Sequence, residues 1–169
     1  MAREENLLQS LELLKEMGFK NDSIRAIKHL PAQEGRYEDY PPEIHLSLLE
    51  ALKQKGFLKL YTHQHASFRA LQEGKNIVVV TPTASGKTLC YNLPVLNTIL
   101  HNSSSRAIYL FPTKSLSQDQ KAELDEIISI LPNEVRIFTY DGDTPQDARK
   151  AIRAGGHIVL TNPDMLHTG

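Results

Sequence analysis

Apolar residues in the first 56 positions recur at the spacing of amphipathic helices. One stripe ends before Gly18, which is expected to stop its helix, and another lies between Pro42 and Gly56. Between them, residues 22–30 form a third, shorter predicted helix. We therefore predict that residues 1–56 are a small helical segment. The two stripes consist of Leu7, Leu8, Leu11, Leu14 and Met17, and of Ile44, Leu48, Leu49 and Leu52.

From residue 57 onward, short apolar runs alternate with amphipathic stretches. The runs are residues 76–81, 106–111, 135–140 and 157–161, which are too short for buried helices and are predicted strands. Residues 87–100, 114–131 and 144–154 are predicted helices, the last with Thr144 as N-cap and Pro145 in the first helical position. Strands joined by such helices predict right-handed crossovers and a parallel sheet, so residues 57–169 are expected to form an α/β domain.

Composition sets limits without indicating a function. The 169 residues are 40% hydrophobic and 23% charged, as expected for one core of moderate size. A net charge of −1 gives no overall attraction to nucleic-acid phosphates, so any such site must be local. The single cysteine, Cys90, excludes an internal disulfide, and no apolar run is long enough to span a membrane. A cytoplasmic protein is the expectation.

A phosphate-binding loop is predicted where the first strand of the α/β region meets its first helix. Residues 81–88, Thr-Pro-Thr-Ala-Ser-Gly-Lys-Thr, follow a run of β-formers. Lys87 is expected to reach the β- and γ-phosphates of ATP, and the Thr88 hydroxyl to join the shell of Mg²⁺. Thr81 stands where the strict pattern has a glycine, so the prediction depends on the flanking strand and helix. Small or polar residues let the backbone approach the phosphates: Thr83, Ala84, Ser85 and Gly86.

Together with this loop, four other segments resemble those of superfamily 2 helicases. Residues 60–64, Leu-Tyr-Thr-His-Gln, resemble the adenine-recognising glutamine element, residues 110–116 resemble motif Ia, and residues 161–167 resemble motif Ib. With Tyr-Asp-Gly-Asp-Thr at residues 140–144, they are most similar to the bacterial DEAD/DEAH helicases of the mitomycin repair factor A and YprA group, which are relatives of RecQ-like DNA helicases.

This resemblance covers residues 31–169 and implies a function for the parent protein. It implies an incomplete RecA-like P-loop domain that belongs to an ATP-dependent DNA helicase with 3′-to-5′ polarity and a role in DNA repair. Single-stranded or tailed DNA is the implied partner. An RNA helicase fragment and a non-catalytic ATP-binding or interaction module are the open alternatives.

The resemblance and the side-chain chemistry together suggest roles for individual residues. The Gln64 amide can pair with the adenine edge while Tyr61 stacks on the base, unless Gln64 lies on an exposed helix face after a Thr62 N-cap. Hydroxyl, N–H and ammonium groups after two strands are expected to contact DNA phosphates, or simply to cap helices. The candidates for nucleic-acid contact are Pro112, Thr113, Lys114, Gly142, Thr161, Asn162, Pro163 and Asp164.

The acidic box that organises Mg²⁺ and water in this family has no counterpart in the sequence. Residues 125–128, Asp-Glu-Ile-Ile, imitate it but lie inside an amphipathic helix, so we interpret them as a solvated helix face. The resemblance implies that the box, the Ser-Ala-Thr element and a second RecA-like domain follow Gly169. We therefore expect the chain to bind ATP weakly, to hydrolyse little, and to expose Val78 and Val80, whose neighbours in the sheet would be missing.

Overall fold

The computed structural model describes residues 2–28, 31, 34–83 and 85–168, and the chain divides into two compact units. The first unit ends at Glu34 and the second begins at Gly35. Residues 35–56 thus belong to the same compact unit as the α/β region, and a domain boundary after residue 56 stays a prediction. Among the described residues, no helix is both long and apolar enough to cross a membrane.

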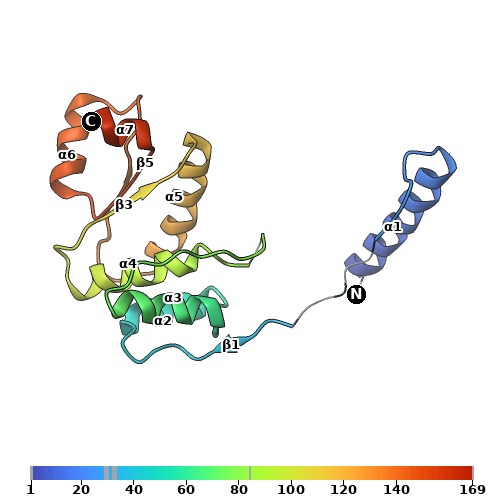
Figure 1. The fold of residues 1–169 in the computed structure, drawn as a ribbon, viewed down its shortest axis with the longest axis horizontal. Helices are drawn as coiled ribbons and strands as arrows, with labels where there is room; N and C mark the ends of the chain where they lie inside the picture. The colour runs from blue at the N-terminus through green and yellow to red at the C-terminus, as the bar shows by residue number, and fades with distance from the viewer. Residues whose placement is uncertain (1, 29–30, 32–33, 84, 169) are drawn as a thin grey trace. The chain divides into compact units, whose positions relative to one another are not determined.

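Helix α1 (Ala2–Lys20) forms most of the first unit (Figure 1). It continues through Gly18, so the expected stop at that residue is wrong. The Ile24 side chain lies over Gly18, where a Cβ atom would come within 2.3 Å of the Ile24 Cδ1 atom. The left-handed residue after the helix is Asp22, with φ of 62°. The helix predicted for residues 22–30 is absent through residue 28, and its last two positions lie outside the described residues.

Helices α2 (Leu46–Gln54), α3 (Thr62–Gln72) and α4 (Leu89–His101) open the second unit. Helix α2 begins four positions after Pro42, later than predicted, and the chain turns at Gly56 with φ of 86°, as the sequence indicates. These helices contribute buried side chains to one continuous core, in which α3 packs against α4. The fully buried side chains include Leu48, Leu52, Phe68, Leu93 and Leu96.

A small antiparallel sheet that the sequence does not predict lies beside α3. Strand β1 (Tyr37–Glu38) pairs with β2 (Leu60–Tyr61), so that Tyr37 is opposite Tyr61. The Thr62 N–H also donates to the Arg36 carbonyl at 3.0 Å, which extends the contact to the start of α3. The segment before α2 is thereby fixed next to the glutamine element.

A three-stranded parallel sheet forms the rest of the second unit. Its strands β3 (Ala107–Leu110), β4 (Ile137–Thr139) and β5 (Ile158–Thr161) lie in the order β3-β5-β4. They are followed by α5 (Lys114–Ile128), α6 (Gln146–Gly155) and α7 (Pro163–Thr168), respectively (Figure 1). The predicted parallel α/β architecture and three of its four strands are confirmed. Because the strands are parallel, the loops that follow them meet at one edge of the sheet.

Residues 76–81, predicted as the first strand, belong to no sheet within the described part of the chain. Their backbone is irregular, and the side chains of Val78 and Val80 are 90% and 88% exposed. The strand prediction is therefore wrong, whereas the expectation that these two valines are uncovered is confirmed. The reason is that a β-former run becomes a strand only when a neighbouring strand satisfies its N–H and C=O groups.

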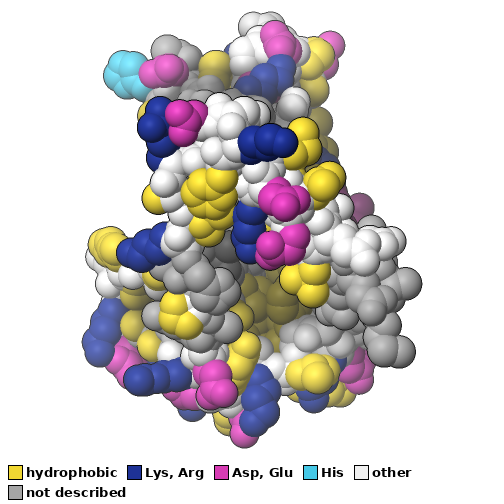
Figure 2. Space-filling model, turned by 90° about the vertical axis from the view of Figure 1, so that its right-hand side faces the viewer, with side chains coloured by type: hydrophobic (Ala, Val, Ile, Leu, Met, Phe, Trp, Pro, Cys, Tyr) yellow, Lys and Arg dark blue, Asp and Glu magenta, His cyan; other side chains and the backbone are white. Residues whose placement is uncertain are grey.

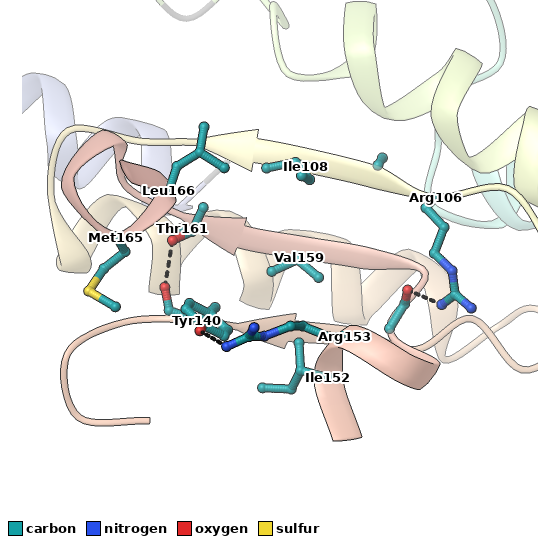
Figure 3. Close-up of a pocket in the computed structure, with 11 residues that line it drawn as sticks. Arg106, Ile108, Tyr140, Ile152, Arg153, Val159, Thr161, Met165 and Leu166 are labelled. Atoms are coloured by element: carbon teal, nitrogen blue, oxygen red, sulfur yellow. Dashed lines mark hydrogen bonds between the residues drawn. The ribbon is translucent and has the colours of Figure 1, made fainter. Parts of the chain in front are cut away.

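The two faces of the parallel sheet are covered to different extents. On the α5 face, Tyr109, Ile158 and Leu160 are buried. On the other face, α6 and α7 border a hollow of about 280 Å³ whose floor includes Ile108 and Val159 (Figure 3). Ile108 is 60% exposed, so this sheet face presents apolar surface to solvent.

Candidate nucleotide site and nucleic-acid interface

In the described part of the loop, residues 81–83 and 85–88, the side chain of Lys87 turns back toward the start of the loop. Its Nζ atom donates hydrogen bonds to the carbonyl oxygens of Thr81, at 2.9 Å, and Pro82, at 2.6 Å. Gly86 has φ of 73°, which residues with a Cβ atom rarely adopt. The Cys90 N–H then donates to the Lys87 carbonyl in the first turn that leads into α4. The loop therefore holds an ammonium group at the N-terminal end of a helix, where anions are favoured.

Other predicted loop residues contribute hydroxyl groups. The Ser85 and Thr81 hydroxyl oxygens lie 2.5 Å apart and share a hydrogen bond across the loop. Thr83 is exposed, and Thr88 is half-buried at the first turn. Ala84 lies outside the described residues. A phosphate oxygen carries negative charge and is a stronger acceptor for the lysine ammonium than the two neutral carbonyls that it now contacts.

Gln64 links the start of α3 to this loop. Its side chain is only 4% exposed, so the alternative of an exposed helix face is wrong. The Oε1 atom accepts a hydrogen bond from the Tyr61 N–H, and the Nε2 atom donates to the Gly86 carbonyl, both at 2.9 Å. Helix α3 begins at Thr62, so the N-cap position belongs to Tyr61. Contact between Gln64 and adenine stays a prediction.

The ring of Tyr61 is part of an aromatic stack beside the loop. Its centroid lies 4.8 Å from that of Tyr37 and 5.5 Å from that of His63, with nearly parallel planes. A Cβ atom on Gly86 would lie 3.7 Å from the Tyr61 ring, which shows how close the stack is to the phosphate loop. The sequence does not indicate Tyr37, because its strand has two residues and its partner is distant along the chain. A flat aromatic surface next to hydrogen-bond donors that could bind phosphate suits a purine nucleotide.

The residues present fit the phosphates of a nucleotide better than they fit a metal ion. Within the part of the chain that the structure describes, no three His, Cys, Asp or Glu side chains gather where they could hold a metal. Thr88 can supply one hydroxyl ligand to Mg²⁺, and phosphate oxygens and water would complete the shell. Asp125 and Glu126 are exposed on α5 and pair with Lys121 and Lys55, as expected for a solvated helix face.

The loops after β3, β4 and β5 meet at the carboxyl edge of the parallel sheet. Thr113 Oγ1 accepts a backbone N–H of α5 at 3.3 Å, and Asn162 Oδ1 accepts one of α7 at 2.8 Å, so both cap helices. Thr161 is buried, and its hydroxyl donates to the Tyr140 carbonyl at 2.7 Å (Figure 3). The remaining candidates are exposed at the same edge: Pro112, Gly142, Pro163 and Asp164.

Lys114 connects two of these loops through ion pairs. Its Nζ atom lies 3.3 Å from the Asp141 Oδ2 atom and donates a hydrogen bond to Asp143. Of residues 140–144, the sequence indicates only Gly142 as a site residue and does not indicate these two aspartates. The two aspartates lie two residues apart in the loop after β4, at the same sheet edge as Lys114. This placement is the signal in the sequence that would identify them as site residues. Figure 2 shows acidic and basic side chains interspersed over the face in view, in agreement with the net charge of −1.

Thr144 belongs to the loop after β4 and does not cap α6. The helix begins at Gln146, and Pro145 occupies the cap position without a side-chain hydrogen bond. The Thr144 Oγ1 atom instead accepts the Asp141 N–H at 2.9 Å. The predicted N-cap at Thr144 is wrong because its hydroxyl closes the loop.

The fold and the loop geometry agree with what known proteins show. The sequence model of the DEAD/DEAH box helicases matches residues 61–168. The chain belongs to the DEAD/DEAH box helicase family. It is 49% identical over 148 residues to the uncharacterized ATP-dependent helicase YprA of Bacillus subtilis (strain 168). It is 38% identical over 160 residues to the ATP-dependent helicase hrq1 of Schizosaccharomyces pombe. The predicted resemblance to the mitomycin repair factor A and YprA group is confirmed.

Solved structures support the RecA-like fold of the chain. A crystal structure of the DUF1998 helicase MrfA bound to DNA and AMPPNP matches 81% of the chain, with a TM-score of 0.78 and 52% sequence identity. The match covers 19% of the MrfA chain. The present chain likewise spans 20% of the length of YprA and 15% of hrq1. It corresponds to a small part of each of these helicases.

Proposed function

We propose that this chain is the ATP-binding portion of an ATP-dependent DNA helicase. The observation that carries the proposal is the placement of Lys87 at a helix N-terminus, in a loop that Gln64 joins to the aromatic stack. Groups suited to the phosphates and to the base of one nucleotide thus lie side by side. Support comes from YprA and hrq1, which are named as ATP-dependent helicases, and from MrfA, which binds DNA and AMPPNP in its crystals.

In this proposal, the side chains divide the work of nucleotide binding. Lys87 exchanges its two carbonyl acceptors for β- and γ-phosphate oxygens, and Ser85 and Thr83 add hydroxyl donors. Thr88 holds Mg²⁺, which supplies positive charge to the phosphates when bound. Gln64 and Tyr61 orient the adenine. Because Gln64 also bonds to the Gly86 carbonyl, occupation of the base site and the conformation of the phosphate loop are linked.

Nucleic acid is proposed to bind at the carboxyl edge of the parallel sheet. The helix N-termini there present backbone N–H groups beside the exposed prolines, and Lys114 adds a cation. The partner we propose is single-stranded or tailed DNA, translocated in the 3′-to-5′ direction by the complete helicase during DNA repair. The 169-residue chain itself is proposed to bind ATP weakly and to hydrolyse little, because its described residues offer no cluster of carboxylates for Mg²⁺ and water.

The test compares Lys87→Ala with wild type. We expect the variant to bind a fluorescent ATP analogue at least about tenfold more weakly, because it loses a charge-assisted hydrogen bond to phosphate. In the complete product of the gene, the same change should abolish DNA-stimulated ATP hydrolysis. Lys53→Ala, on the exposed side of α2, is the matched control and should behave as wild type. Equal binding and equal hydrolysis in Lys87→Ala and wild type would defeat the assignment.

RNA is the second candidate substrate, since the ATP-dependent RNA helicase DBP9 of Vanderwaltozyma polyspora is 31% identical to the chain over 134 residues. Stimulation of ATP hydrolysis by oligothymidine and by oligouridine, measured in the complete gene product, separates the two. We expect oligothymidine to stimulate more strongly. Greater stimulation by oligouridine would favour the RNA helicase, and no stimulation by either would favour a non-catalytic ATP-binding or interaction module.

A further inference from the structure

Lys114 is the cation of the proposed nucleic-acid site, yet two carboxylates already engage it. Its ammonium contacts Asp143, and Asp141 Oδ2 lies 3.3 Å away. The hydrogen bonds that Lys114 donates to Asp143 and Asp141 raise the pKa of Lys114, and the bond that Asp143 accepts lowers the pKa of Asp143. Lys114 and Asp143 are therefore both charged at neutral pH. A phosphate that approaches Lys114 meets a cation whose nearest neighbours are anions.

The loop that carries these carboxylates is held in one conformation. The Asp143 N–H donates to Asp141 Oδ1 at 3.0 Å, and the Asp141 N–H donates to Thr144 Oγ1 at 2.9 Å. The Arg149 guanidinium of α6 donates to the Thr144 carbonyl at 2.9 Å and to the Asp141 carbonyl at 3.3 Å. These bonds fix the loop backbone and the Asp141 carboxylate, whereas the Asp143 carboxylate is exposed and is held by its contact with Lys114.

The base of the same loop is tied to the neighbouring strand. The buried Thr161 hydroxyl donates to the Tyr140 carbonyl at 2.7 Å, and the Arg153 guanidinium donates to the Tyr140 hydroxyl at 3.0 Å (Figure 3). Lys114, Asp141 and Asn162 line one small cleft at this sheet edge. The carboxylates therefore lie among the residues proposed to contact nucleic acid.

We propose that Asp141 and Asp143 are specificity-determining residues that hold Lys114 by intramolecular ion pairs, which a nucleic-acid phosphate must displace in order to bind. This inference rests on the proposed function of the sheet edge in nucleic-acid binding. Isolated anions gain too little to displace the carboxylates, whereas a strand that contacts several groups at once does. The pair with Asp143 is exposed and contributes little to folding, and the same carboxylate competes with a phosphate for Lys114.

Replacement of both aspartates by asparagine tests the proposal in the 169-residue chain. The probe is a fluorescein-labelled oligothymidine of about 20 nucleotides, whose anisotropy is followed at salt concentrations of about 50 and 200 mM. We expect Asp141→Asn/Asp143→Asn to bind roughly three- to tenfold more tightly than wild type at the lower salt. Asp125→Asn/Glu126→Gln, at the other end of α5, changes the net charge equally and should alter affinity by less than about twofold.

A second background shows whether the carboxylates act through Lys114. In the Lys114→Met background, the two asparagine substitutions should increase the affinity for oligothymidine by less than about twofold, because no cation remains to be released. If circular dichroism shows that the double variant folds poorly, the single variant Asp143→Asn replaces it, because it changes one exposed residue. We expect this single variant to show part of the gain in affinity.

The results also separate this inference from the proposed function. Wild type that binds oligothymidine, with no gain in the asparagine variants, would overturn the inference alone. An equally large gain in affinity in the α5 control variant would also overturn the inference. So would a gain from the two asparagines that is the same in the Lys114→Met background, because both results indicate general charge repulsion. Failure of wild type and of every variant to bind would remove the proposed nucleic-acid function of this edge, and the inference with it.

Discussion

At the scale of single residues, Gln64 shows how one buried amide can support both the fold and the nucleotide site. Its two polar atoms bond to the Tyr61 N–H and the Gly86 carbonyl. We expect Gln64→Ala to lower the free energy of unfolding by about 1–3 kcal/mol, because buried groups lose their partners. Urea denaturation measures this change. Gln72→Ala, at the exposed end of the same helix, should have little effect, and an equal loss in both variants would contradict the prediction.

His157 is expected to make stability depend on pH. Burial lowers its pKa below the ordinary value of 6.5, and the nearby charges of Arg136 and Arg106 lower it further. Its Nδ1 atom accepts the Arg136 N–H at 3.0 Å, which requires a neutral ring nitrogen. The unfolded chain therefore binds more protons, so this contribution to stability is complete above pH 6.5 and is lost as the pH falls below it.

The variant His157→Asn isolates this effect, because asparagine keeps an acceptor but does not titrate. The difference in unfolding free energy between wild type and variant should be constant above pH 6.5 and should shrink at lower pH. Urea denaturation from pH 5 to pH 8 gives the two curves. Curves that stay parallel over the whole range would show that His157 does not carry the effect.

The sequence predicts the chemical role of an individual residue more reliably than it predicts which residues that side chain contacts. The Lys87 side chain, the Thr113 cap and the exposed acidic pair on α5 follow from residue type and local spacing. The contacts of Lys114 with Asp141 and of Gln64 with Gly86 join segments that are distant along the chain. Such contacts depend on how strands and helices are placed by the whole fold, so local patterns do not indicate them.

At the scale of elements, we expect the exposed segment of residues 76–81 to promote association between copies of the chain. Val78 and Val80 are almost fully exposed, and exposed β-formers without partners promote pairing between copies. We expect Val78→Thr/Val80→Thr to shift sedimentation toward the monomer while the free energy of unfolding changes by less than about 0.5 kcal/mol. Leu160→Ala, in the buried centre of β5, should cost about 2–5 kcal/mol by comparison. A large loss of stability in the threonine variant would show that the valines are packed.

The sequence predicts well those helices and strands whose type is determined by the spacing of apolar residues within the element itself. Strands β3, β4 and β5 and helices α4 to α6 combine the right period with suitable lengths and partners. Strands β1 and β2 have two residues each, too few for a periodic pattern, and they form through pairing across a long loop. The opposite error occurs at residues 76–81, where the pattern is strong but a partner strand is lacking among the described residues.

At the scale of the whole molecule, the buried core is confined to one of the two units. The core residues run from Ile44 in the segment before α2 to Leu160 in β5, and all belong to the second unit. In α1, by contrast, the apolar side chains are exposed: Leu7, Leu8, Leu11, Leu14 and Met17. Helices in proteins owe most of their stability to the packing of an apolar face, and the apolar side chains of this 19-residue helix are exposed. Most of the folding free energy must therefore come from residues 35–169.

A chain that begins at Gly35 tests this division. We expect it to keep the free energy of unfolding of the complete chain within about 0.5 kcal/mol, because none of the described side chains before Gly35 belongs to the core. Binding of a fluorescent ATP analogue should also be unchanged, since the phosphate loop, Gln64 and the aromatic stack all lie after residue 35. Urea denaturation and the binding titration are compared in the two chains. A loss of more than about 1 kcal/mol would contradict the prediction.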